Sequence, residues 1–229
     1  TPNPKPQTPF ISLLSNINGF NGITESVIID GTSQEGWQEN TTNGMVTISR
    51  NVSNTDAFGL ILDGVGATDV EIYGLHFTGF PRPIRINTGA DGFKIGAVGK
   101  GNVINQFSGT AGIEAFAKDG TIVGNKIGTD ETGTVLNTST GTTGIRLTSG
   151  AENTTIRENI IAGSTLTLAS NDNTVENNKI GTGITGNETG LGITSGTAYN
   201  GVQIEGNTNQ ITNNIIGDFS GSGIQTLNA

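Results

Sequence analysis

The charged residues that could do chemistry gather between Arg82 and Arg146, with Arg85 and Glu114 among them. Elimination in an acidic polysaccharide needs a cation that stabilises the developing negative charge and a base, often Arg or Lys, that removes a proton. This group could supply both parts, so a polysaccharide lyase is one hypothesis. The alternative is a ladder of surface salt bridges, each contributing under about 1 kcal/mol.

Hydrolysis of a glycosidic bond would instead need two carboxylates about 5 to 9.5 Å apart. Acids at outward positions are present, for example Glu71, Glu176 and Glu205, but they are scattered along the repeat. The sequence also has no paired-aspartate motif and no Gly-His-Gly element. It therefore predicts no convergent hydrolase pair.

Three further residues are candidates for ligand contact. Asp130 and Glu131, in a turn rich in Gly and Thr, could hold Ca²⁺ with loop carbonyls, or could form an ordinary turn. Trp37, the only tryptophan, could stack on a sugar ring or could cap the first coils. The single histidine, His76, cannot form a histidine-rich metal site, and the chain has no cysteine. Ca²⁺ is thus the one cofactor with a candidate site.

The composition restricts the partners. A formal net charge of −9 disfavours nucleic acid and anionic membranes, which attract clustered Lys and Arg, whereas a neutral glycan or a cation fits better. No run of about 18 apolar residues is present to span a membrane. Without cysteine, stability must come from backbone ladders and stacked side chains rather than from disulfides.

These side chains have to be positioned by a repeat. Short segments with alternating apolar residues begin at Gly59, Pro83, Gly112, Gly144, Thr165, Gly201 and Gly223, so successive starts are 24, 29, 32, 21, 36 and 22 residues apart. A basic period of about 21 to 24 residues with insertions is typical of one solenoid coil per repeat.

Alternation within each segment assigns side chains to opposite faces of a strand. The predicted inward column contains Leu60, Ile84, Ile113, Ile145, Leu166, Val202 and Ile224. The neighbouring outward column contains Ile61, Arg85, Glu114, Arg146, Thr167, Gln203 and Gln225. Glu114 should therefore lie between two guanidinium groups.

A second strand family follows in each coil, and asparagine recurs at one place in it. The predicted column contains Asn105, Asn125, Asn159, Asn178 and Asn214. Stacked asparagines can bond the coils above and below through their amides, so an asparagine ladder is expected.

Two inserts interrupt the period, one after Lys126 and one after Lys179, each directly after the letters NKIGT. They should project from the same edge of the solenoid, where loops often carry function, although loops also lengthen without any role. Residues 1–10 are rich in proline and predict an extended tether. Residues 11–229 predict one parallel β-helix domain of roughly nine coils, part of a larger protein.

Three segments of the sequence resemble those of a known family. Val27–Trp37, Gly101–Gly109 and Gly124–Thr134 are similar to recurring segments of large bacterial right-handed parallel β-helix repeat proteins of the pectate-lyase-like superfamily. The similarity extends from about Val27 to Ala229. It implies a right-handed solenoid and a secreted or cell-surface location, but no activity, since most members have none assigned.

Together these features predict a non-catalytic, rigid extracellular segment for adhesion or glycan contact. Its partners would be a surface glycan or other extracellular polymer, or neighbouring copies stacked end to end through exposed strand edges. The alternative is a polysaccharide lyase or glycoside hydrolase acting on an acidic polysaccharide.

Overall fold

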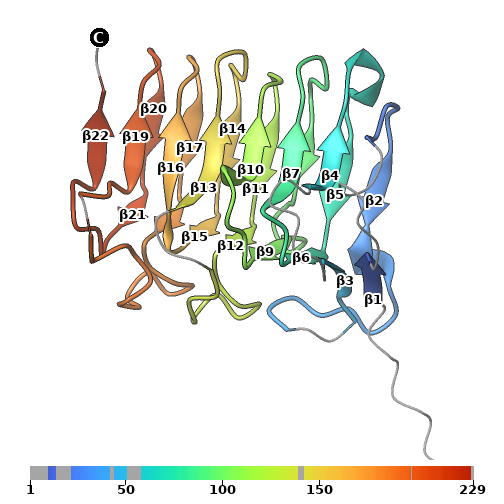
Figure 1. The fold of residues 1–229 in the computed structure, drawn as a ribbon, viewed down its shortest axis with the longest axis horizontal. Helices are drawn as coiled ribbons and strands as arrows, with labels where there is room; N and C mark the ends of the chain where they lie inside the picture. The colour runs from blue at the N-terminus through green and yellow to red at the C-terminus, as the bar shows by residue number, and fades with distance from the viewer. Residues whose placement is uncertain are drawn as a thin grey trace, which may run out of the picture.

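A computed structural model describes residues 10–13, 22–41, 44–50, 58–138, 142–196 and 198–227, so most of the predicted tether lies outside the described residues. These residues form three parallel sheets, with eight, seven and seven strands, that run along one axis (Figure 1). The order of strands in each sheet follows the order of coils in the chain.

Sheet A contains β1 (Phe10–Leu13), β3 (Val46–Arg50), β6 (Leu75–Thr78), β9 (Val103–Asn105), β12 (Lys126–Ile127), β15 (Ile160–Ile161), β18 (Lys179–Ile180) and β21 (Ile215–Ile216). Sheet B contains β4 (Phe58–Leu62), β7 (Arg82–Ile86), β10 (Ala111–Ala115), β13 (Thr142–Leu147), β16 (Ser164–Leu168), β19 (Val202–Ile204) and β22 (Ile224–Thr226). Sheet C contains β2 (Ile28–Asp30), β5 (Glu71–Tyr73), β8 (Lys94–Ile95), β11 (Thr121–Val123), β14 (Thr155–Arg157), β17 (Thr174–Glu176) and β20 (Gln210–Thr212). Gly31–Ser33 and Val65–Ala67 form short 3-10 helices.

Each coil runs through sheet B, then sheet C, then sheet A, before the next coil begins. Successive strands of a sheet pair in parallel, as β4 does with β7 and β7 with β10. The predicted parallel β-helix of the right-handed type is confirmed. Its longest sheet has eight strands, one fewer than the roughly nine coils expected from the spacing.

The register predicted for sheet B is confirmed along its whole length. Leu60 pairs with Ile84, Ile84 with Ile113, and the column continues to Ile224. Most of these side chains are fully buried, and each fully buried Ile or Leu contributes roughly 1.5 to 3 kcal/mol to stability. Strand alternation therefore builds the core.

The second strand family is two strands in each coil rather than one. A residue in the left-handed backbone region separates the sheet C strand from the sheet A strand, for example Gly74 (φ 62°), Gly124 (φ 69°) and Glu158 (φ 57°). Such a residue cannot continue an extended strand, so the chain turns there. We call this turn between sheets C and A the ladder corner.

An asparagine ladder occupies the ladder corner. Its members are Asn102, Asn125, Asn159, Asn178 and Asn214. From Asn125 onward, each side-chain Oδ1 accepts hydrogen bonds from the backbone N–H and from Nδ2 of the asparagine in the preceding coil, at 2.8–3.0 Å. The ladder satisfies backbone groups that the turn leaves without sheet partners.

The assignment of Asn105 to this ladder is wrong. Its place is taken by Asn102, whose Oδ1 accepts from the backbone N–H of Leu75. Asn105 instead lies at the end of β9, where its Nδ2 donates to the carbonyl of Thr129 at 3.3 Å and its Oδ1 lies 3.2 Å from Nε2 of His76.

The buried residue of β9 that pairs with Phe77 and with Ile127 is Ile104, so this strand lies three residues earlier than Asn105 in the ladder would require. The letters GNVI at 101–104 match GNKI at 124–127, so the correct signal was present in the sequence.

Three excursions leave the coils. The loops between β12 and β13 and between β18 and β19 both connect sheet A to sheet B and project from the same side of the solenoid, as predicted (Figure 1). They touch each other, since the Ile184 N–H donates to the Gly133 carbonyl at 3.0 Å. The third excursion, between β2 and β3, leaves at the ladder corner and includes Trp37. The described residues hold no helix long and apolar enough to cross a bilayer.

Candidate functional site

The predicted charged row on the outer face of sheet B is present. Arg85, Glu114 and Arg146 are paired across β7, β10 and β13. Arg85 Nη1 lies 3.3 Å from Glu114 Oε2, and its Nε donates to Asn87 Oδ1 at 2.7 Å. The Arg85 guanidinium also lies 4.5 Å from the ring centroid of Phe116. Arg85 and Glu114 thus already have partners.

The other two arginines differ in their surroundings. Arg82, at the start of β7, places its guanidinium 5.3 Å from the ring centroid of Phe58. Arg146 forms no ion pair with the described residues, and its Nε is buried without a hydrogen-bond partner among them. The structure therefore brings three of the four charged residues into one row, in which Arg146 has no ion-pair partner among the described residues.

Asp130 forms a turn. Its Oδ1 accepts from the backbone N–H groups of Thr134 and Val135 at 3.1 Å, and its Oδ2 accepts from the Thr132 hydroxyl at 2.7 Å. Burial raises the pKa of Asp130, but these hydrogen bonds outweigh burial and hold it below its usual value. A Ca²⁺ ion at Asp130 and Glu131 would compete with these hydrogen bonds for the Asp130 oxygens. Within the described ranges no three His, Cys, Asp or Glu side chains are grouped to hold a metal ion.

Trp37 packs against the solenoid. Its indole Nε1 is buried without a hydrogen-bond partner among the described residues, and a Cβ at Gly74 would lie 3.1 Å from it. These contacts favour the capping interpretation of Trp37 over sugar stacking. His76 is half-buried as well, between Thr47 and Asn105, and burial lowers its pKa.

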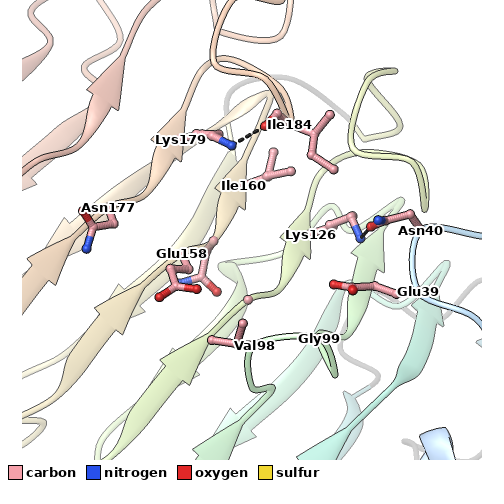
Figure 2. Close-up of a pocket in the computed structure, with 12 residues that line it drawn as sticks. Glu39, Asn40, Val98, Gly99, Lys126, Glu158, Ile160, Asn177, Lys179 and Ile184 are labelled. Atoms are coloured by element: carbon pink, nitrogen blue, oxygen red, sulfur yellow. Dashed lines mark hydrogen bonds between the residues drawn. The ribbon is translucent and has the colours of Figure 1, made fainter.

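A trough lies on the outer face of sheet A and is lined by polar and charged side chains together with apolar ones. It has a volume of about 250 Å³ (Figure 2). Its floor is formed by the outward side chains of β12, β15 and β18, namely Lys126, Ile160 and Lys179, which pair in register. We call this site the sheet A trough. It was not predicted as a site.

The walls of the sheet A trough come from distant segments. One wall is the ladder corner, with Val98 and Glu158; the other contains Glu39 and Asn40 from the excursion after β2, and Ile184 from the second insert. Figure 2 shows Lys126 beside Asn40 at one end and Lys179 beside Ile184 at the other, with Ile160 between them. Only the folded solenoid brings these segments together.

Lys126 is the most unusual group in the sheet A trough, because only 7% of it is exposed. Its Nζ donates to Asn40 Oδ1 at 2.5 Å. Burial lowers the pKa of Lys126, while the charges of Glu39, Asp130 and Glu131 act in the opposite direction. The ammonium has three donor hydrogens, so further acceptors can be bound.

Comparisons with family models, with curated proteins and with solved structures found no match to this chain. The coil architecture rests on the strand pairing itself, and the resemblance to bacterial repeat proteins stays a prediction about family. Function has to be argued from the geometry of the two outer faces.

Proposed function

We propose that this chain is a non-catalytic, rigid β-helix segment of a secreted or cell-surface protein, of the kind found in bacterial parallel β-helix repeat proteins. In this proposal its loop-bearing edge contacts a surface glycan. The supporting observation is the unbroken ladder corner, in which five asparagines bond successive coils.

Rigidity follows from how the coils are joined. Strands repeat about every 4.8 Å along the axis, and each added coil forms backbone ladders with its neighbour. The asparagine side chains add two hydrogen bonds per step, inside a core where hydrogen bonds are strengthened by low polarity. Such a rod would hold its projecting loops at fixed spacing, which suits a segment that presents a binding edge.

Glycan contact is favoured by charge and by the placement of loops. A chain of net charge −9 repels polyanions, and the excursion after β2 and the insert between β18 and β19 border one concave polar surface. The charged row on sheet B supports catalysis less well, because Glu114 already binds Arg85.

A polysaccharide lyase is retained as the second candidate because of one observation. Arg146 has a buried Nε without a partner among the described residues, next to the Arg85–Glu114 pair. An arginine in this position could bind a uronate and stabilise its developing charge.

One experiment separates the two candidates. The purified chain would be incubated with uronate and neutral polysaccharides, with and without Ca²⁺, and also applied to a glycan array. The proposal expects binding without turnover. Turnover that disappears in Arg85→Ala or Arg146→Ala would establish the lyase, and a wild-type chain that binds no glycan would remove the adhesive role.

A further inference from the structure

We infer that the sheet A trough is a binding subsite for a neutral sugar unit. This inference rests on the proposed glycan contact and specifies where it occurs and which chemical class is bound. The observations that carry it are the concave shape, the buried ammonium of Lys126 and the balance of charges around it.

The donors in the trough are positioned but not saturated. Among the described residues, Lys126 Nζ makes one hydrogen bond, to Asn40, and Lys179 Nζ makes one, to the carbonyl of Ile184. Each ammonium carries three hydrogens, so both can donate to ligand oxygens without losing these bonds. In the strand register Ile160 lies between the two lysines. Their backbones are therefore two strand spacings apart along the solenoid axis, about 10 Å.

The acceptors match the donors in number. Glu39 and Glu158 line the trough with the two lysines, so the charged lining sums to zero. Glu39 forms no ion pair within the described part of the chain, whereas Glu158 pairs with Arg157 at 2.6 Å. A sugar hydroxyl both donates and accepts, so it can use ammonium and carboxylate groups side by side.

The same balance disfavours charged ligands. An anionic sugar would meet Glu39 and Glu158 and, beyond them, the charges of Asp130 and Glu131 that act on Lys126. A cationic ligand would meet a lysine that is itself buried. A neutral, hydroxyl-rich ligand avoids both costs.

Size and apolar surface agree with a sugar. The volume of about 250 Å³ is below the roughly 300 to 1,000 Å³ of pockets for drug-sized ligands, which suits a single ring with its substituents. Ile184 on the wall is half-buried and offers apolar surface to the C–H face of a ring, above the floor at Ile160, of which 6% is exposed.

The test is a titration of the full chain with neutral hexose di- to tetrasaccharides, followed by calorimetry or by NMR shifts. Lys126→Met keeps the apolar stem and removes the ammonium, and it should weaken binding about tenfold or more, as expected for a lost bond to a charged group. Glu39→Ala changes an exposed loop residue and should weaken binding several-fold. Lys94→Met, an exposed lysine on sheet C, serves as the matched control and should bind as the wild type does.

Two further arms test the ligand class. Affinity for the neutral sugars should stay constant when NaCl is raised from about 0.05 to about 0.5 M, because no net charge is neutralised. Tighter binding of uronic-acid oligosaccharides, lost at high salt, would overturn the assignment to neutral sugars.

The outcomes separate this inference from the proposed function. If the wild type binds neutral sugars and both Lys126→Met and Glu39→Ala bind equally well, the trough is not the subsite, while glycan contact stands. If the wild type binds no sugar at all, glycan contact itself is wrong. Thermal unfolding of Lys126→Met would show whether its weaker binding reflects a destabilised loop. If the loop is destabilised, the affinity of Glu39→Ala decides whether the trough is the subsite.

Discussion

The two turns that flank sheet C share one backbone feature and differ in their interiors. At the ladder corner and at the turn between sheets B and C, which we call the second corner, most coils have a left-handed residue followed directly by a residue that points inward. At the second corner these left-handed residues include Asp69 (φ 55°), Asp119 (φ 58°) and Asp172 (φ 58°).

The inward residues show the difference. The ladder corner has Leu75 followed by asparagines in every later coil as far as Asn214. The second corner has Val70, Phe93 and Gly120 in its early coils, and Thr154, Asn173 and Asn209 in its later ones. An asparagine is therefore not required by the turn itself. It is useful where it can bond the coils on both sides, and a large apolar side chain can fill the same place.

The largest expected effect is at the ladder corner. Asn125→Ala would leave the backbone N–H of Asn102 buried without a partner and would remove the bond from Asn125 Nδ2 to the carbonyl of Ile95. The free energy of unfolding should fall by roughly 3 to 5 kcal/mol, as measured by urea denaturation. Asn187→Ala in an exposed loop is the control and should change little. A loss below about 1 kcal/mol for Asn125→Ala would show that the ladder contributes little to stability.

A clash at the second corner is expected to have the next largest effect. A Cβ at Gly120 would lie 2.2 Å from the ring of Phe93, so Gly120→Ala should lower the free energy of unfolding by about 2 to 3 kcal/mol. Adding Phe93→Leu should recover part of the loss in thermal unfolding. If the double variant is as unstable as the two losses added together, the ring is not what Gly120 accommodates.

The polar half of the second corner should tolerate an apolar replacement better. Asn173→Val, which imitates Val70, removes the acceptor for the Thr154 N–H at 2.9 Å. In the wild type, Asn173 Nδ2 donates to the side chains of Ser170 and Asn209, so the substitution takes no hydrogen bond from a buried backbone carbonyl. We expect a loss of about 1 to 2 kcal/mol by urea denaturation. A loss equal to that of Asn125→Ala would mean that the two corners depend equally on asparagine.

The smallest expected effect concerns the second insert. Slight burial raises the pKa of Glu188, but hydrogen bonds from Thr185 and its neighbours lower it from 4.5 to about 2. Because the folded-state pKa is the lower one, this carboxylate stabilises the fold above pH 4.5, and that contribution is lost as the pH falls toward about 2. Glu188→Gln should show a shallower loss of stability in acid than the wild type, as followed by circular dichroism. Identical acid profiles would contradict this role.

Strand alternation in the sequence predicts much of the fold. The inward and outward columns of sheet B are correct from Leu60 to Ile224, because period-two alternation and a repeated coil length leave one register that buries the apolar set. Sheets A and C are harder to predict from the sequence. Their strands are only two to five residues long, so alternation alone does not reveal the left-handed residue inside one apparent strand. The predicted ladder therefore contains Asn105 where Asn102 belongs.

The candidate site likewise has one part that the sequence predicts and one part that it does not. The sequence alone determined that Arg85, Glu114 and Arg146 share a row, because this follows from strand period and coil spacing. In the structure, Lys126 and Lys179 lie in one column of sheet A. Only the tertiary structure decided that the lysine column is concave. The excursion that carries Asn40 and the insert that carries Ile184 fold back over sheet A, and no local pattern encodes where a loop of that length comes to rest.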